Sequence, residues 1–418
     1  MKRLIYVPLI LCLVLLAACT SGDDDPPPVT PLSSPTLAPI PWVRPQAAIS
    51  QENARIQLSG TMLAHQATVN DVAFTLSGSR LASVAADNSV IVWNLANGQS
   101  LFEQGEVSAR HVFFGPNDET LITITPAGFT RVWAMNIAPP RELEELVSFM
   151  AIDQDIRTLV QSPDRSLLAF GTETGQVRIW RVPEGQLMAE IQASGNVIEN
   201  MEFSPDSRYL ATLGKDWTAR VWSVPDGELV YDLINQVESE ISRIPVTLAW
   251  SANADRLALG YTTGVEVWDM STGGARYMIN TAENMVSSAL QFSPDGSLLA
   301  GCGRQPRIEL WNAATGSTAA GLPLPTSICN KLAFSPDGTL LFATPVPGRD
   351  ALLWNLQPLL AGSSDGQVML GQANRDSMHL LPGTVFFDFE WSPDGRFIVL
   401  LDELGPMYAL TASISPAS

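Results

Sequence analysis

The sequence predicts an all-β fold, a single closed β-propeller of four-stranded blades, with eight blades favoured and seven as the alternative. Three observations support this prediction. A tryptophan recurs roughly every 43 residues, a tight-turn motif recurs between strand-like segments, and 30 glycines and 30 prolines in 418 residues indicate many short elements. With 46% hydrophobic and 16% charged residues, the chain has enough apolar material for a large core.

The first 18 residues have the order of a secretory signal peptide. Lys2 and Arg3 precede an almost wholly apolar run over 4–16, which is too short to span a bilayer comfortably. The tetrad Leu-Ala-Ala-Cys at 16–19 resembles the lipobox of bacterial lipoproteins, which implies cleavage before Cys19 and acylation (palmitate among the chains) of its thiol. The alternative is an ordinary signal peptide with a cysteine near its cleavage site. Several acyl chains would anchor the protein stably to a membrane.

A Pro-rich tether follows the cysteine. We therefore predict a signal peptide over 1–18, lipidated Cys19 and its tether over 19–50, and the propeller over 51–418. Pro-rich chains extend by ~3.1 Å per residue, so the tether gives the propeller reach. The expected location is the cell envelope, outside the cytoplasm. In a cell with two membranes, the residue after Cys19 is Thr20 and not Asp, which favours the outer membrane. In a cell with one membrane, the protein would lie on the external face of the cytoplasmic membrane.

The repeat itself has two markers, a tryptophan and an earlier hydrophobic residue that ends a strand-like run. The repeat tryptophans are Trp93, Trp133, Trp180, Trp222, Trp268, Trp311 and Trp354. The earlier markers, 18 to 20 residues before them, are Phe74, Phe114, Val160, Phe203, Trp250, Phe292 and Phe334. An eighth copy runs from Trp391 to Tyr408. Ser-Pro-Asp turns, with Asp at Asp164, Asp206, Asp295, Asp337 and Asp394, follow several of the earlier markers and are interpreted as structural.

Each unit therefore reads as a hairpin plus a third strand, which is one propeller blade with its outer strand still to be supplied. The segment 54–58 precedes the first unit, and it is predicted to form the outer strand of the last blade. Pairing the two chain ends in this way would close the ring and remove a free sheet edge. The interval between Trp354 and Trp391 is the weakest part of the blade count.

Residues 63–93 resemble a WD repeat. In that family a histidine, a serine or threonine, an aspartate and the tryptophan form a hydrogen-bonded relay within the blade. The resemblance implies that His65, Ser83, Asp87 and Trp93 form this tetrad. Thr212, Asp216 and Trp222 keep the same spacings without the histidine and form a partial tetrad. The other repeats keep little beyond the tryptophan, so packing is expected to hold them.

No enzyme chemistry is indicated by the motifs. The three histidines have no histidine or cysteine at ligand spacing, and there is no phosphate loop, nucleophile elbow or calcium loop, so no metal, cofactor or catalytic residue is predicted. The net charge is −19 and no Lys/Arg cluster is present, which argues against nucleic-acid binding.

Two cysteines remain after Cys12 leaves with the signal peptide and Cys19 is lipidated. Cys302 ends the second strand of the sixth repeat, and Cys329 begins the first strand of the seventh. In an oxidising compartment these two can pair as a disulfide. The alternative is two separate buried thiols.

The loops that carry the tetrad are the expected binding face. Trp217 follows Asp216 in such a loop and is either an interface anchor or a cover for the neighbouring blade. Arg304 and Arg349 lie in similar loops and are candidates for contact with an acidic partner.

The function expected from these features is that of a monomeric, membrane-anchored scaffold that binds an envelope or extracellular protein. One alternative is a propeller enzyme, or a binder of small ligands or carbohydrates, that uses the central funnel. A cluster of carboxylates, His and Arg that converge on the channel and have perturbed pKa values would favour this alternative. The other alternative is a structural factor in envelope assembly.

Overall fold

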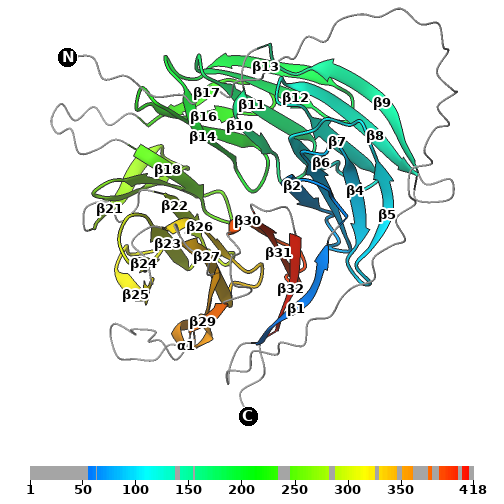
Figure 1. Ribbon diagram of the computed structural model, residues 1–418. Coiled ribbons are helices and arrows are strands. Elements are labelled where there is room, and N and C mark those ends of the chain that lie inside the picture. Colours follow the sequence, from blue (N-terminus) through cyan, green and yellow to red (C-terminus); the bar gives the residue numbers. More distant parts are fainter. Residues whose placement is uncertain are drawn as a thin grey trace, which may run out of the picture. The chain divides into compact units, whose positions relative to one another are not determined.

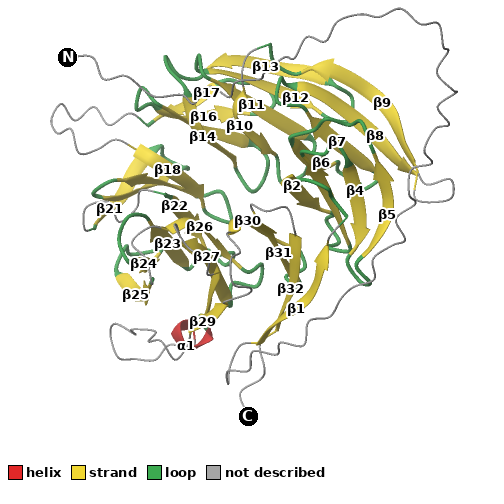
Figure 2. Ribbon diagram, viewed as in Figure 1, coloured by secondary structure: helices red, strands yellow, loops and turns green. Residues whose placement is uncertain are grey.

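The computed structural model describes residues 55–62, 64–136, 142–153, 156–233, 245–281, 288–324, 329–345, 351–360, 375–378, 386–402 and 407–413. All of them belong to one compact unit, Pro39–Ser418. They form eight antiparallel four-stranded sheets arranged in a ring, each of which is one blade (Figure 1). Strands dominate the described residues, and one short helix, α1 (Gln357–Leu360), follows the seventh blade's third strand (Figure 2).

The first four blades have their strands in chain order from the ring's centre outwards. Blade 1 consists of β2 (Val69–Phe74), β3 (Arg80–Ala85), β4 (Val90–Asn94) and β5 (Gln99–Gln104); blade 2 of β6 (His111–Phe114), β7 (Thr120–Ile124), β8 (Phe129–Asn136) and β9 (Glu142–Met150); blade 3 of β10 (Ile156–Gln161), β11 (Leu167–Thr172), β12 (Gln176–Arg181) and β13 (Gln186–Gln192); blade 4 of β14 (Ile198–Phe203), β15 (Tyr209–Gly214), β16 (Ala219–Ser223) and β17 (Leu229–Asp232).

The next three blades repeat this order, and the last one differs in its outer strand. Blade 5 consists of β18 (Pro245–Trp250), β19 (Arg256–Tyr261), β20 (Gly264–Asp269) and β21 (Gly274–Asn280); blade 6 of β22 (Ala289–Phe292), β23 (Leu298–Cys302), β24 (Arg307–Asn312) and β25 (Thr318–Pro323); blade 7 of β26 (Cys329–Phe334), β27 (Leu340–Pro345), β28 (Ala351–Asn355) and β29 (Arg375–Met378); blade 8 of β30 (Phe386–Trp391), β31 (Phe397–Asp402), β32 (Met407–Ser413) and β1 (Arg55–Met62).

The ring is closed by the N-terminal strand, as the sequence predicts. β1 pairs antiparallel with β32, from Arg55 opposite Ser413 to Met62 opposite Met407, and so becomes the fourth strand of blade 8. The eight-blade prediction is confirmed and the seven-blade alternative is wrong. Pairing of the two chain ends covers the edge that β32 would otherwise expose.

The hydrophobic core is divided into eight clusters, and each cluster lies between two consecutive blades. One of them packs Met62, Val69 and Trp93 against Val399 and Met407, which joins blade 1 to blade 8. Every blade therefore buries both of its faces against neighbours. Within the described residues, no helix is long and apolar enough to cross a membrane.

The turn after each inner strand explains the recurring Ser-Pro-Asp sequence. In blade 6, the Ser293 hydroxyl donates to Asp295 Oδ1 at 2.5 Å and accepts from the Leu298 amide at 2.9 Å. Gly296 follows at a φ of 70°, which favours glycine. Hydrogen bonds to Asp295 hold the turn, which is consistent with the structural interpretation of these aspartates.

The register corrects one repeat marker. Phe203 pairs with Leu210 at the end of the inner hairpin, and the residue that pairs with Leu168 at the same place in blade 3 is Gln161, not Val160. The Gln161 side-chain amide donates to the Phe114 carbonyl at 2.8 Å and so joins blade 3 to blade 2. Hydrophobicity favoured Val160 because a glutamine is not expected at a buried marker position.

Candidate functional site

The four predicted tetrad residues of blade 1 lie in one hydrogen-bonded network. Trp93 Nε1–H donates to Ser83 Oγ at 2.8 Å, and Ser83 Oγ lies 2.7 Å from His65 Nε2. On the other side of the ring, His65 Nδ1 lies 2.8 Å from Ser89 Oγ and 3.4 Å from Asp87 Oδ2. Ser89 Oγ–H donates to Asp87 Oδ1 at 2.6 Å.

These contacts determine which atom donates and which accepts in each hydrogen bond of the network. Because Ser89 donates its hydroxyl proton to Asp87, its oxygen accepts from His65 Nδ1–H. The other nitrogen, Nε2, then accepts from Ser83, whose oxygen in turn accepts from Trp93. Burial lowers the pKa of His65 despite the nearby Asp87 charge, which keeps the imidazole neutral as this pattern requires. Ser89 is therefore a member of the network that the sequence did not identify.

Removal of the Ser83 hydroxyl should weaken blade 1. In a Ser83→Ala chain, the buried Trp93 indole N–H and His65 Nε2 both lose their partner, so we expect a loss of about 2 kcal/mol in the free energy of unfolding. Urea titration followed by tryptophan fluorescence measures this loss. Ser100→Ala, at an exposed position of the same blade, is the control and should change stability by less than about 0.5 kcal/mol. Equal effects of the two substitutions would contradict the network's structural role.

Blade 4 contains the partial tetrad and a substitute for the missing histidine. Trp222 Nε1–H donates to Thr212 Oγ1 at 2.9 Å, and Thr218 Oγ1–H donates to Asp216 Oδ1 at 2.7 Å. Ser194, which lies as far before Trp222 as His65 lies before Trp93, also hydrogen-bonds Asp216. Burial alone would raise the pKa of Asp216, but hydrogen bonds from Ser194, Thr218 and the Gly195 amide lower it to about 2. The carboxylate is thus held charged.

The remaining repeat tryptophans lie on the third strands of their blades, as the repeat predicts. Trp133 Nε1 donates to Thr123 Oγ1 at 2.8 Å, and this hydroxyl stands ten residues before the tryptophan, as Ser83 and Thr212 do in blades 1 and 4. Trp180 Nε1 donates to the Ala151 carbonyl at 2.9 Å. In contrast, the indole nitrogens of Trp268 and Trp354 are buried without a hydrogen-bond partner within the described residues. Trp311 is buried among the apolar side chains of blades 5 and 6.

A disulfide joins blades 6 and 7. Cys302 at the end of β23 and Cys329 at the start of β26 are bonded, with a Cα–Cα distance of 5.8 Å. Both side chains are completely buried in the cluster between the two blades. Of the two alternatives that the sequence left open, the structure has the bonded one.

The three candidate interface residues differ in what the structure says of them. Trp217 is 59% exposed, so most of its side chain is open to solvent. Its φ is 68°, which is strained for a bulky residue, whereas the equivalent position in blade 1 is Asn88, which tolerates this conformation. Arg304 is also exposed. Arg349 and Cys19 lie outside the described residues.

The channel at the centre of the ring is lined by layers of side chains, one from each blade, and we call each such layer a level. The first level consists mostly of polar side chains. The register places one residue per blade at this level, three positions before the end of each inner strand: Asp71, His111, Thr158, Asn200, Thr247, Ala289, Lys331 and Asp388. Its charges are largely paired. His111 Nδ1 lies 3.2 Å from Asp71 Oδ2, and Lys331 Nζ donates to Asp388 Oδ1 at 2.6 Å.

The second level, two positions further along each strand, is mostly apolar. Its residues are Ala73, Phe113, Val160, Glu202, Ala249, Gln291, Ala333 and Glu390. Glu202 and Glu390 are the two ionisable groups among these eight positions, and we call them the channel glutamates. They belong to blades 4 and 8, which are four places apart in a ring of eight, so they approach the channel from opposite sides.

The protein around the channel raises the pKa values of both channel glutamates, although Glu390 is exposed to the channel and Glu202 is half-buried. Burial raises the pKa of Glu202 to about 8, and a hydrogen bond from the Trp250 backbone only partly opposes this. Burial also raises the pKa of Glu390 to about 7. The positive charges of Lys331 and Arg165 oppose this shift, and the negative charges of Asp71 and Asp388 reinforce it. Neither carboxylate has an ion-pair partner within the part of the chain that the structure describes.

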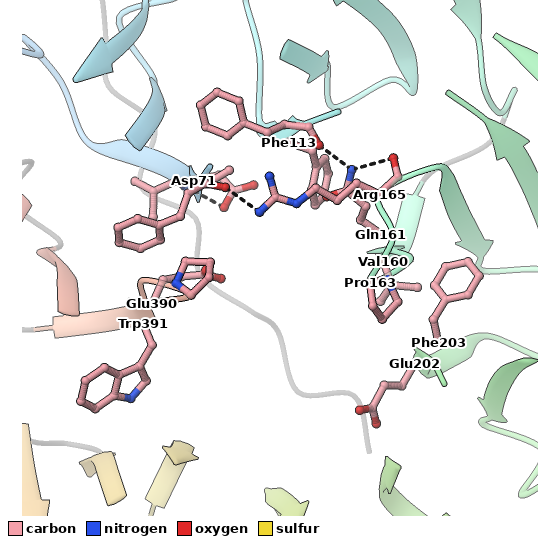
Figure 3. Close-up of a pocket in the computed structure, with 15 residues that line it drawn as sticks. Asp71, Phe113, Val160, Gln161, Pro163, Arg165, Glu202, Phe203, Glu390 and Trp391 are labelled. Atoms are coloured by element: carbon pink, nitrogen blue, oxygen red, sulfur yellow. Dashed lines mark hydrogen bonds between the residues drawn. The ribbon is translucent and has the colours of Figure 1, made fainter. Parts of the chain in front are cut away.

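A cavity of about 420 Å³ lies in this channel (Figure 3). Its walls include Phe113, Val160 and the two channel glutamates, which stand on different sides of the open space. Arg165 lines the same cavity, but its guanidinium is engaged by Asp118 Oδ1 at 2.8 Å and the Phe74 carbonyl at 2.9 Å. Sequence periodicity could not identify this site, because its residues come from five different blades. No group of three His, Cys, Asp or Glu among the described residues is arranged to hold a metal ion.

The raised pKa values predict that stability falls as pH rises from about 5 to 8. In this range the folded chain holds protons that the unfolded chain, with ordinary glutamate pKa values, has released. Glu202 is only half-buried, so screening by solvent reduces its expected contribution to about 1 kcal/mol of the loss. Urea unfolding at pH 5.5 and pH 8 should show a smaller difference for the Glu202→Gln, Glu390→Gln chain than for the unaltered one. An identical pH dependence in both would contradict these shifts.

Family models match two parts of the chain. Residues 56–94 match the model described as "WD domain, G-beta repeat", and residues 159–253 match the "Anaphase-promoting complex subunit 4 WD40 domain". Human apoptotic protease-activating factor 1 is 32% identical over 151 residues, which is 33% of this chain and 11% of that protein. The rat protein is 35% identical over 130 residues, 30% of this chain and 10% of that protein. The chain thus matches about a tenth of these relatives' length.

Solved structures resemble this chain over most of its length. Sqt1 from Chaetomium thermophilum aligns with a TM-score of 0.67 at 17% identity, over 84% of this chain and 96% of that one. The C-terminal WD40 domain of Sif2 aligns with a TM-score of 0.66 at 12% identity, over 85% of this chain and 98% of that one. At such identities the likeness concerns the fold alone. The described part of the chain is thus an eight-bladed β-propeller, and two of its segments are similar to WD-repeat models.

Proposed function

We propose that this chain is a lipid-anchored scaffold outside the cytoplasm, which binds another envelope or extracellular protein through its propeller. The observation that carries the binding role is Trp217, a bulky apolar side chain that is 59% exposed on a left-handed loop residue. Exposed tryptophans are frequent anchors of protein interfaces, and backbone strain clusters at functional positions. Sqt1, whose fold is similar, has been solved bound to the N-terminus of the ribosomal protein L10.

Two features support export and anchoring. The signal-like segment ends in Leu-Ala-Ala-Cys at 16–19, and the Cys302–Cys329 disulfide is typical of proteins that fold in an oxidising compartment. An acylated Cys19 would hold the protein on the membrane, and the Pro-rich segment after it would let the propeller reach partners away from the surface.

Metabolic labelling with a palmitate analogue tests the anchor. The unaltered chain should take up label and fractionate with membranes, and Cys19→Ser should abolish both. Cys12→Ser, in the segment that is removed, is the matched control and should keep the label. Labelling that persists in Cys19→Ser would refute anchoring at this residue.

Site-specific photo-crosslinking in intact cells tests the binding role. A crosslinking amino acid at position 217 should capture a discrete protein partner. The same amino acid at Leu187, which is 42% exposed on the outer strand of blade 3, should not. Indistinguishable capture from the two positions, or none from 217, would exclude Trp217 as the anchor.

The channel provides a specific reason to keep small-ligand binding as a second candidate function. Carboxylates, His111 and Arg165 converge there, and two of the carboxylates have raised pKa values. Such a convergence of ionisable groups with shifted pKa values favours a ligand in the central funnel. The two roles are compatible, because Trp217 and the channel glutamates belong to different parts of the fold.

A further inference from the structure

We propose that the channel cavity binds an alkylammonium or guanidinium group carried on an apolar stem, held between Glu202 and Glu390. This inference rests on the second candidate function, ligand binding in the channel, and is independent of the scaffold role. The ligand chemistry has two sources, a free small amine or a basic side chain inserted by a partner.

The charge of the ligand follows from which groups in the channel are already paired. Lys331 donates to Asp388 at 2.6 Å, and Arg165 donates to Asp118 at 2.8 Å. The channel's two cations are therefore occupied. The channel glutamates form no salt bridge within the described residues, although Lys331 and Arg165 partly offset the charge of Glu390. Carboxylates therefore outnumber cations along the cavity wall. A cation is the ligand that such groups recognise most strongly.

The ligand is expected to have an apolar stem because the side chains beside the two glutamates are mostly apolar. Ala73, Phe113 and Val160 line the cavity between them, and these side chains offer no hydrogen bond to a hydrated ion. A bare metal ion would lose water there without gaining ligands on most sides. An alkyl chain instead covers the apolar wall while its charged end meets a carboxylate.

The size and symmetry of the site are also consistent with this ligand. A cavity of about 420 Å³ is in the range of small-molecule sites. The two glutamates lie on opposite sides of the channel, so a molecule with a single cationic end can engage either of them.

Binding should be coupled to proton release. A bound cation stabilises the charged form of each carboxylate, so it lowers their raised pKa values. Around pH 7.5 these carboxyl groups are partly protonated in the free protein. Ligand binding at this pH should therefore release protons to the buffer. Asp71, Asp388, Lys331 and Arg165 surround Glu390 and set its starting value.

Isothermal titration calorimetry on the full chain with Cys19→Ser tests the proposal. The probes are 1,5-diaminopentane, a lysine-containing hexapeptide, and 1,5-pentanediol as the uncharged analogue. We expect saturable heat with the diamine, the peptide or both, and none with the diol. Glu202→Gln and Glu390→Gln should each weaken binding by about tenfold or more. The released protons are taken up by the buffer, so the binding enthalpy measured in buffers of different ionisation enthalpy should differ.

Glu199→Gln is the matched control, because this exposed residue lies on the same strand as Glu202 and pairs with Lys215 outside the cavity. It should bind the probe as the unaltered chain does, and circular dichroism should show all variants folded. Binding of the diamine alone would assign the site to a free amine, and binding of the peptide alone to a partner's side chain. No binding of either, or binding unaffected by both glutamine variants, would overturn the proposal and leave the scaffold role standing.

Discussion

Deletion of β1 (residues 55–62) is expected to destabilise the propeller by at least about 4 kcal/mol. This segment pairs with β32 along its length and buries Met62 between blades 8 and 1. Its loss would remove a buried methionine side chain, a cost of about 2–5 kcal/mol, together with a ladder of backbone hydrogen bonds. Thermal or urea unfolding, followed by tryptophan fluorescence, measures the effect.

The matched control is an equally long deletion in the tether, residues 31–38, which should leave stability unchanged. A synthetic peptide with the sequence of residues 55–62 should restore part of the lost stability when it is added in excess, because it binds only the folded ring. Equal stability of the two deletion chains would show that β1 does not close the ring.

Loss of the disulfide is the second large effect that we expect. Replacing Cys302 and Cys329 with serine opens a covalent loop with a sequence separation of 27 residues, which corresponds to about 3 kcal/mol of lost stability. The serine hydroxyls would also be buried in the cluster between blades 6 and 7. Urea unfolding with and without a reducing agent measures this.

Reductant should lower the stability of the unaltered chain and leave the double serine chain unaffected, which makes the variant its own control. A thiol titration under denaturing conditions, before and after reduction, should show two additional free thiols only after reduction. If reductant changes nothing and both thiols react without it, the two cysteines are not bonded.

The sequence was sufficient for the architecture because a tryptophan recurs in seven of the eight units, with Tyr408 in the eighth, and a turn follows the inner strand of each unit. Each blade must bury both faces, so the same marker positions stay apolar, and their spacing counts the blades. The N-terminal strand could be assigned because the last repeat lacked an outer strand. The method failed at blade 3, where Gln161 occupies the marker position and satisfies its amide with the Phe114 carbonyl. A half-buried polar side chain with a specific partner has no hydrophobic signal.

The networks were partly visible in the sequence. His65, Ser83, Asp87 and Trp93 were placed together by resemblance, but Ser89 and Ser194 were missed. The signal for Ser89 was present: a hydroxyl residue stands two positions after the aspartate in both blades, at Ser89 and Thr218. Each such hydroxyl donates to its aspartate.

The channel glutamates could not be found from sequence. Glu202 and Glu390 each look like an ordinary polar residue in the alternation of a strand. Their importance depends on the ring, which places blade 4 across from blade 8 and gathers enough protein around the channel to raise both pKa values. The ring also determines that their neighbours at the same level are apolar. This relation between distant blades leaves no local pattern.

Hydrogen–deuterium exchange of the β1 amides tests the central claim, a ring of eight blades closed by the N-terminal strand, most directly. We predict that peptides covering residues 55–62 exchange as slowly as those covering β32, and that both lose protection together as urea is added. Exchange of 55–62 at the rate of a free peptide, while β31 and β32 stay protected, would contradict the closure of the ring.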